Sequence, residues 1–279
     1  MGDNRTLDQL RQHFRVEKEL AERLRRSSRD ERRTIYATLY NELFDRVPDH
    51  PRLITHTSKE EVERTVRARM AIVAPHVRAG QTVVEFAPGD CCLSFELCRT
   101  AAKVIGIDIS DQSGADASRP ANFELVIYDG YELNLPDAFA DLAFSYQFLE
   151  HLHPDDIDLH FATAFRLLKP GGCYVFATPH RFSGPHDVSR HFTVNPEGFH
   201  LQEWTFRSMR QHLRCAGFAA DYAYRSGRCR RGALWNWATD ALEMVIGLLP
   251  RRLQQRVSQR LFASVTMMAV KGGAAARGS

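Results

Sequence analysis

Through the N-terminal quarter of the chain, apolar side chains recur at steps of three and four, which is the spacing of amphipathic helices. Leu7 and Leu10 begin one such apolar face. A second helix is predicted to start at Ser28, because Ser28 and Glu31 form the pattern of a capping box. The sequence therefore predicts a helical N-terminal extension over residues 1–75.

The prolines of segment 47–53 end the second helix, and a third helix is predicted to start at Ser58. Two roles are open for these helices. They either pack against the sheet and support a homodimer, or they form a lid over a substrate. Tyr36, Tyr40 and His56 are the candidate lid side chains.

Beyond the extension, short apolar runs bounded by turn residues alternate with helical patterns, as in α/β proteins with a parallel sheet. The predicted strands cover residues 83–86, 104–109, 123–128, 139–144, 173–178, 218–224 and 262–270. We therefore predict a core domain over residues 76–227 and 262–271. Before the last strand, residues 228–261 are predicted to form a basic, amphipathic helical insert that Pro250 divides.

The segment 81–110 has the organisation of half a nucleotide site. An apolar strand runs into a turn at Pro88 and Gly89, and the next strand ends in an acid, Asp108. In doubly wound folds a ligand binds outside the carboxyl ends of the strands, where turn amides face it and an acid holds ribose hydroxyls. A nicotinamide dinucleotide is disfavoured, because its fingerprint needs more glycines than this turn contains.

Motif I of the class I S-adenosylmethionine (SAM) dependent methyltransferases, acid-x-G-x-G-x-G, resembles the turn Glu85-Phe86-Ala87-Pro88-Gly89-Asp90-Cys91. The order Leu-Glu-His at 149–151, then Leu-Leu-Lys-Pro-Gly-Gly at 167–172 and an apolar strand, is typical of the same family. The resemblance covers residues 65–225. It implies a seven-stranded Rossmann-like methyltransferase sheet with helices on both faces, in addition to the extension and the insert.

The resemblance also implies SAM as the cofactor and places its binding residues at the carboxyl ends of the strands. Glu85, Ala87 and Gly89 would face the methionine end, Asp108 and Ile109 the ribose, Asp129 and Gly130 the adenine, and Tyr146 and Gln147 the methyl group.

A hydroxyl acceptor of the methyl group must lose its proton, and histidine is the base best suited to take it near neutral pH. His186, in the polar loop 179–204, is the first candidate, and His151 is the second. Asp187 is an acid next to His186 in the chain and could orient it. Surface, capping or ion-pair roles are the alternatives for each of these side chains. Further candidates for binding the acceptor are His180, Arg181 and Arg190.

Composition adds limits to this interpretation. The chain has 279 residues, is 44% hydrophobic and carries a net charge of +3, which fits one catalytic domain without a strong overall attraction to nucleic acid. Its six cysteines lack zinc spacing and suit a reduced, cytoplasmic compartment. The histidines of the polar loop do not form a recognised ligand set, so no metal is predicted. No transmembrane segment is predicted either.

Between Arg225 and Arg260 there are eight arginines and two acids. This stretch either covers the sheet as a solvated helix pair, or makes peripheral contact through residues 228–260 with an anionic membrane or an acidic substrate.

Together these features predict a SAM-dependent methyltransferase that acts on an oxygen atom of a small-molecule or glycoconjugate acceptor, with a histidine as general base. Two other functions stay open because the glycine turn is altered. One is a catalytically silent member of the fold that serves as a binding or scaffold protein. The other is an enzyme that uses SAM without transferring its methyl group. Nucleic acid is not expected as a partner, because the arginines of the insert are not interleaved with stacking residues.

Overall fold

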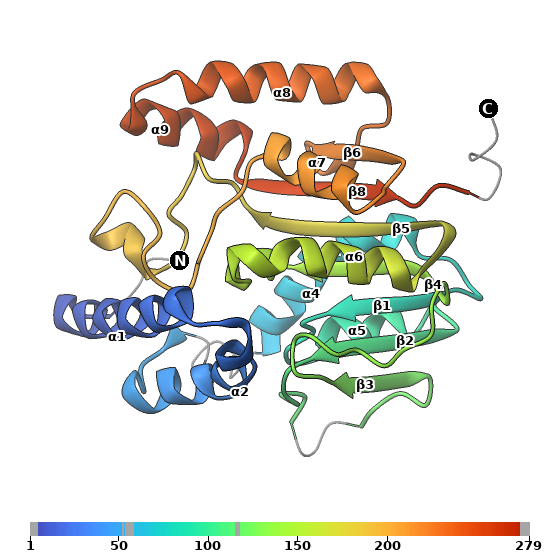
Figure 1. The fold of residues 1–279 in the computed structure, drawn as a ribbon, viewed down its shortest axis with the longest axis horizontal. Helices are drawn as coiled ribbons and strands as arrows, with labels where there is room; N and C mark the ends of the chain where they lie inside the picture. Colours follow the sequence, from blue (N-terminus) through green and yellow to red (C-terminus); the bar gives the residue numbers. More distant parts are fainter. Residues whose placement is uncertain (1–4, 52, 54–58, 115–117, 274–279) are drawn as a thin grey trace.

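Within the described residues, eight strands form one mixed sheet in the order β3-β2-β1-β4-β5-β8-β6-β7 (Figure 1). The computed structural model describes residues 5–51, 53, 59–114 and 118–273. The strands are β1 (Thr82–Phe86), β2 (Lys103–Asp108), β3 (Phe123–Ile127), β4 (Ala140–Tyr146), β5 (Leu168–Pro179), β6 (Ala220–Arg225), β7 (Arg228–Cys229) and β8 (Ser264–Val270).

The strands β1 to β5 run parallel, and β8 enters antiparallel between β5 and β6. The carboxyl ends of the parallel strands therefore meet at one edge of the sheet, on the left in Figure 1. Chain order reverses at β1, which has β2 on one side and β4 on the other, and α/β sheets bind ligands at such a switch point. The last strand thus pairs antiparallel with both of its neighbours.

The predicted count of seven strands is wrong, because residues 228–229 form an eighth. Ser226 and Gly227 have φ angles of 50° and 71°. Positive φ at both central residues of a tight hairpin matches the twist of the flanking strands, so the chain turns back and pairs with the end of β6. The predicted insert therefore begins with a short strand, and its first helix starts at Ala233.

Helices cover both faces of the sheet, as predicted (Figure 1). Side chains of α4 and α5 pack on one face, and side chains of α6, α7 and α8 pack on the other. The helices are α1 (Leu7–Arg26), α2 (Arg29–Arg46), α4 (Lys59–Val73), α5 (Cys92–Leu97), α6 (Ile157–Leu167), α7 (Phe206–Cys215), α8 (Ala233–Gly247) and α9 (Arg251–Leu261). Pro250 separates α8 from α9, as the sequence predicts.

The helices α1 and α2 lie beside the carboxyl ends of the parallel strands (Figure 1). Val16, Leu20 and Leu43 are fully buried there, in one cluster with Phe199 and Leu201 from the loop after β5. By contrast, α4 packs on the sheet. The alternative in which the N-terminal helices cover a face of the sheet therefore applies to α4 and not to α1 or α2.

The start of α2 follows its predicted capping pattern. The hydroxyl of Ser28 accepts from the amide of Glu31 at 3.4 Å, and the Glu31 carboxylate accepts from the amide of Ser28 at 2.7 Å. This reciprocal pair satisfies two amides of the first turn. Ser58, the predicted start of the third helix, and His56, a predicted lid residue, lie outside the described residues.

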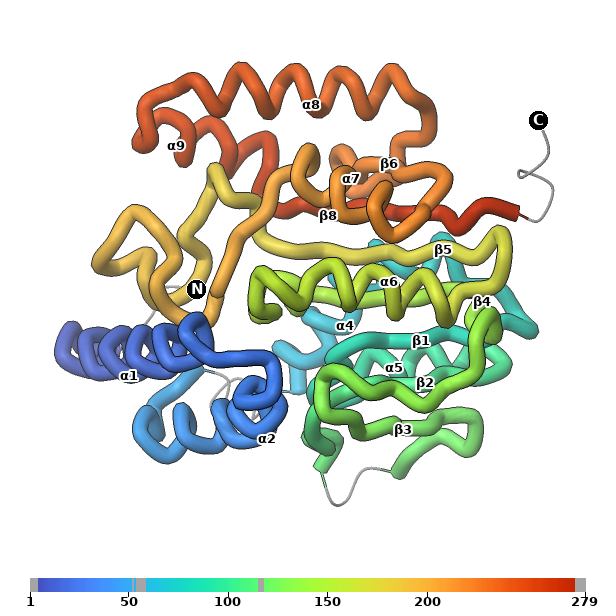
Figure 2. The backbone as a smooth tube through the Cα atoms, viewed as in Figure 1, coloured from blue at the N-terminus to red at the C-terminus, as the bar shows by residue number. Residues whose placement is uncertain are grey.

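The loop between β5 and α7 runs from α9 to α1 (Figure 2). On the α1 side, Lys18 pairs with Glu197 at 2.6 Å, and Arg25 donates to the carbonyl of Gly198 at 3.3 Å. On the other side, Arg251 of α9 donates to the carbonyl of Gly184 at 3.0 Å. The N-terminal helices and the insert therefore hold this loop from both ends.

Candidate active site

A cavity of about 590 Å³ lies at the carboxyl ends of the parallel strands. We name one part of its wall the strand-end half. It consists of lining residues from α4 and from the segments where the parallel strands end, which are 85–90, 107–112, 128–131 and 146–147. The other part, named the loop half, consists of lining residues from α1, α2, α6 and the loops that follow β4 and β5, together with Arg5, His50 and Pro51.

The turn after β1 keeps a glycine-like backbone. Ala87, Gly89 and Cys91 have φ angles of 53°, 60° and 60°, and they stand where motif I has its glycines. A left-handed backbone costs a residue with a Cβ about 1–2 kcal/mol, yet two of these positions carry one. The Cys91 side chain is buried and does not line the cavity, and burial raises the pKa of its thiol to about 12.

Two acids stand at the strand ends beside this turn. The Asp108 carboxylate accepts from the amide of Gly89 at 3.1 Å and from the amide of Ile109 at 2.7 Å. It therefore ties the turn to the end of β2. The Glu85 carboxylate accepts from the hydroxyl of Ser94 at 2.5 Å, and complete burial raises the pKa of Glu85 to about 7. Both acids line the cavity.

The other predicted cofactor residues fall into two groups. Gly130, Tyr146 and Gln147 line the cavity, as expected for residues next to a ligand. Asp129 does not line it. Its carboxylate accepts from Arg33 of α2 at 2.6 Å and from two amides of the turn that follows it. The structure thus gives Asp129 a role in holding α2 against the end of β3.

His151 lines the loop half of the cavity. Its Nδ1 lies 3.0 Å from the carbonyl oxygen of Phe199. Because a carbonyl oxygen only accepts, Nδ1 carries a hydrogen, and in the neutral imidazole the lone pair is on Nε2. The ring is edge-on to that of His200, with the two centroids 5.2 Å apart.

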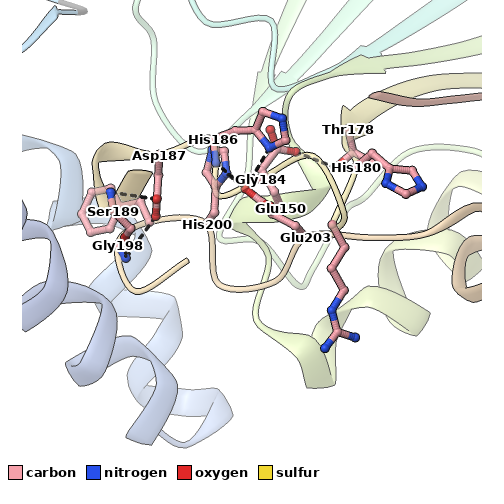
Figure 3. A network of polar contacts seen from close by, with 12 residues as sticks. Glu150, Thr178, His180, Gly184, His186, Asp187, Ser189, Gly198, His200 and Glu203 are labelled. Atoms are coloured by element: carbon pink, nitrogen blue, oxygen red, sulfur yellow. Dashed lines mark hydrogen bonds and ion pairs between the residues drawn. The ribbon is translucent and has the colours of Figure 1, made fainter. Parts of the chain in front are cut away.

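Glu203 connects two further histidines of the loop half (Figure 3). Its Oε1 lies 3.0 Å from Nδ1 of His200 and 3.2 Å from Nδ1 of His186. Burial raises the pKa of Glu203, but these two hydrogen bonds outweigh it and lower that pKa to about 2. Burial lowers the pKa of His200, but Glu203 and the charge of Glu150 raise it to about 9. His200 is therefore an imidazolium at neutral pH.

Asp187 does not orient His186, contrary to the prediction. Its carboxylate accepts from the amides of Ser189 and Gly198, each at 3.0 Å, and so caps the short helix that follows (Figure 3). Neighbouring side chains in this extended segment point in different directions. The acid that contacts the His186 ring is Glu203, 17 residues further along the chain.

Of the three predicted acceptor-binding residues, only Arg190 lines the cavity. His180 is fully buried elsewhere, with Nε2 at 2.8 Å from Glu243 of α8 and its ring stacked on Phe262. Arg181 is exposed outside the cavity, and its carbonyl oxygen accepts from α9. Contrary to the prediction, His180 and Arg181 therefore join the loop to the insert instead of lining the site.

Comparison with known proteins points to methyltransferases. Residues 84–176 match the family model described as a methyltransferase domain. A Mycolicibacterium smegmatis protein named a probable S-adenosylmethionine-dependent methyltransferase is 30% identical over 147 residues, which are 52% of this chain and 55% of that protein. Residues 84–176 therefore form a methyltransferase domain, and the chain resembles SAM-dependent methyltransferases. It spans about half the length of the curated relative that it matches.

Solved structures resemble the methyltransferase domain in fold. A SAM-dependent methyltransferase from Archaeoglobus fulgidus has a TM-score of 0.50 and 17% identity, over 75% of this chain and 94% of that one. Phosphoethanolamine N-methyltransferase 2 from Haemonchus contortus, in complex with SAM, has a TM-score of 0.51 and 14% identity, over 74% of this chain and 52% of that one. At such identities the likeness concerns the fold alone.

The strand-end half of the cavity has the space and the polar groups to bind SAM. A Cβ built on Gly89 would meet no atom within 4 Å, so the space above the turn is open. The Asp108 carboxylate accepts from the amides of Gly89, Ile109 and Ser110, and it lines the same wall as Ile109 and Gly130. These residues can therefore contact the sugar and the methionine end of a bound SAM molecule.

Sequence reasoning missed several residues of the loop half. In one group, Glu17 of α1 lies 2.8 Å from Nε2 of His13 and 3.8 Å from Nε2 of His50. Burial raises the pKa of Glu17, but the two histidines outweigh it and lower that pKa to about 2. The other missed residues are His200 and Glu203. The abundance of histidine in the loop was the only available signal, and it did not identify the partners.

Two groups of side chains in the described residues have the ligand types of a metal site, with candidate atoms within 4.8 Å of one another. In the first group Arg5 donates to Nδ1 of His13, so Nε2 of His13 carries the hydrogen that Glu17 accepts. In the second group His200 is protonated and has no lone pair to offer. We therefore assign no ion to either. The groups are His13, Glu17 and His50, and Glu150, His151 and His200.

Proposed function

We propose that this domain transfers the methyl group of SAM to a hydroxyl oxygen of a small-molecule or glycoconjugate acceptor, with His151 as the general base. The observation that carries the proposal is the hydrogen bond between Nδ1 of His151 and the carbonyl oxygen of Phe199, at 3.0 Å. It leaves Nε2 of the neutral ring as the atom that accepts a proton. The same ring lines a cavity that the proposed cofactor site also lines.

The side chains of the loop half each have a task in this proposal. When bound, SAM supplies a methyl group that its sulfonium has already activated. His151 takes the proton of the acceptor hydroxyl at Nε2, which makes the oxygen a stronger nucleophile. The imidazolium of His200, next to His151, favours the negative charge that develops on that oxygen. Tyr36 and Tyr40 of α2 line the cavity and keep water out.

His186 is the second candidate for the base. Glu203 orients its ring, and Nε2 lies 3.2 Å from the hydroxyl of Ser183. To take a proton at Nε2, His186 would have to give up this hydrogen bond. Asp187 and Arg190 line the same wall, and we propose them as contacts for the polar groups of the acceptor.

At the cofactor, we propose that Asp108 and Ile109 hold the ribose, that Gly130 borders the adenine, and that Tyr146 and Gln147 border the methyl group. Glu85, Ala87 and Gly89 would form the wall for the methionine end. The support for these roles is their shared lining of the strand-end half. Asp129 has no part in this proposal, because its carboxylate is engaged by α2.

The test is transfer of label from methyl-labelled SAM into extracts of oligosaccharides, glycolipids and small hydroxylated molecules, with mass spectrometry of the labelled product. We expect label in a methyl ether. Label on nitrogen or carbon would reject the oxygen assignment. SAM that is bound or consumed without labelled product would support an enzyme that does not transfer the methyl group. Absence of any heat of SAM binding in calorimetry would support a catalytically silent scaffold.

A further inference from the structure

The outer side of α8 is an uncovered apolar stripe. Leu234 is 74% exposed, Trp237 69%, Met244 58% and Leu248 83%. Steps of three, seven and four residues place these four side chains on one face of the helix. The opposite face, with Thr239 and other buried residues, packs toward the core. The stripe is therefore not the core-facing side of this helix.

This exposure is concentrated in one place. Most of the large apolar side chains that are exposed in the described part of the chain lie on α8 and α9 or directly between them. Scattered single residues of this kind are ordinary on a protein surface, whereas a contiguous patch marks an interaction site. Figure 1 shows α8 at the edge of the molecule, on the side opposite to β3.

Exposed arginine side chains lie on the two helices that contact α8, namely α7 and α9. On α9, Arg252, Arg256 and Arg260 are exposed and recur every four residues, so they share one face. On α7, the exposed Arg207 and Arg214 line a groove of about 370 Å³ together with Trp237 and Met244 of the stripe.

The two acids of the insert do not cancel this charge at the surface. Glu243 is buried, where it accepts from the amides of Phe206 and Arg207 and contacts His180. Asp240 is 38% exposed and lines the groove, where it forms an ion pair with Arg210. The outer side of α8 and α9 therefore combines exposed tryptophan and leucine with an excess of arginine, since one acid is buried and the other is paired.

We propose that the outer side of α8 and α9 docks on an anionic lipid bilayer. Tryptophan and leucine side chains enter the boundary between headgroups and acyl chains, while arginine side chains bind anionic headgroups. The contact is peripheral, since no helix of the described residues has the length and apolar content that a membrane crossing needs. A protein partner or a second copy of the chain would not by itself call for the exposed arginines on the helices that flank the stripe.

The docking surface is connected to the active site. Arg251, the first residue of α9, donates to the carbonyls of Arg181, Gly184 and Val194, which flank His186 in the loop. A bilayer bound to α8 and α9 thus lies next to the loop that forms part of the acceptor wall. If the methyl transfer proposed above is correct, the acceptor class that this arrangement favours is a lipid-linked glycoconjugate.

The test uses flotation of the full chain with vesicles and does not depend on activity, so it can succeed or fail independently of the proposed reaction. We expect binding to phosphatidylcholine vesicles that contain phosphatidylglycerol, weak binding to pure phosphatidylcholine, and loss of binding as salt is raised. Replacing both Trp237→Ser and Leu248→Ser should weaken binding by about tenfold or more. Replacing both Arg252→Gln and Arg256→Gln should weaken it by about thirtyfold, at roughly 1 kcal/mol per arginine.

Ile127→Ser is the matched control, because Ile127 is also exposed, at 51%, but lies on β3 at the other end of the sheet. It should bind vesicles like the unmodified protein. The proposal is overturned if anionic vesicles do not bind, or if the control variant loses as much binding as the stripe variants. It is also overturned if the unmodified protein is a dimer that the stripe variants convert to monomers, since a second copy would then cover the face.

Discussion

The two halves of the cavity are built in different ways. Apart from the α4 residues that border it, the strand-end half comes from one continuous part of the chain, between Glu85 and Gln147. Its turn is fixed by hydrogen bonds of backbone amides, such as that from the Gly89 amide to the Asp108 carboxylate. The loop half joins α1, the segment after β4 and the loop after β5, and it is fixed by ionisable side chains. Local backbone geometry thus sets one ligand site, and long-range packing sets the other.

The largest expected effect tests the chemistry of the loop half. His151→Ala should lower kcat by about 10²–10⁴-fold, because a positioned general base contributes that much to proton transfer. The affinity for SAM should not change, since the strand-end half is left intact. Rates measured at saturating SAM, together with calorimetric titration of the cofactor, separate the two quantities.

His212→Ala is the control for this change, because His212 pairs with Asp158 between α7 and α6 and does not line the cavity. It should retain normal kcat. If His151→Ala kept full activity while His186→Ala lost it, the base would be His186 and the tautomer argument for His151 would be wrong.

The next effect tests the strand-end half. Asp108→Asn should weaken SAM binding by roughly tenfold to a hundredfold, since a hydrogen bond to a charged group contributes about 1.5–3 kcal/mol. At saturating SAM, kcat should be nearly normal. Asp129→Asn is the matched comparison and should leave SAM affinity within about threefold, because the Asp129 carboxylate is held by Arg33 outside the cavity. Equal losses in both variants would restore the predicted contact of Asp129 with adenine.

The same contrast explains how much the sequence could predict. Apolar runs and turn residues were enough to place the strands and the acid Asp108, because each depends on its immediate neighbours. The eighth strand was missed because it has only two residues, Arg228 and Cys229, and depends on a hairpin turn. Adjacency in the chain suggested Asp187 as the partner of His186, whereas the folded loop brings Glu203 to it.

The loop half should also give a pH dependence of a different kind from that of the strand-end half, where the pKa of Glu85, raised by burial from 4.5 to about 7, lowers stability as pH rises through that range. The pKa of His200 is raised from 6.5 to about 9, so its contribution to stability is complete below pH 6.5 and is lost as pH rises to about 9. The pKa of Glu203 is lowered from 4.5 to about 2, so its contribution is present above pH 4.5 and is lost as pH falls toward 2. Both contributions are complete between pH 4.5 and pH 6.5, so these two groups stabilise the loop most in that range.

Glu203→Gln should remove most of this contribution. We expect the free energy of unfolding at pH 6 to fall by about 2 kcal/mol, and the difference from the unmodified protein to shrink as pH rises toward 9. The difference is the quantity to measure, because Glu150, with a pKa raised to about 7 by burial, titrates nearby in both proteins. Denaturant titrations at several pH values provide it. If the difference between the two free energies of unfolding stayed constant from pH 6 to 9, Glu203 would not be the group that raises the pKa of His200.

The smallest effect concerns the backbone of the glycine-like turn. Ala87 has a φ of 53°, a conformation that costs a residue with a Cβ about 1–2 kcal/mol more than glycine, whereas glycine loses about 0.5–1 kcal/mol of extra chain entropy on folding. Ala87→Gly should therefore raise the free energy of unfolding by up to about 1 kcal/mol. In Ala216→Gly the sign should reverse, because Ala216, at the end of α7, has a φ of −73° and bears no such strain. Thermal unfolding measures both changes. If Ala87→Gly raises the free energy of unfolding and Ala216→Gly lowers it, the backbone conformation at each position, and not the loss of a methyl group, determines the effect.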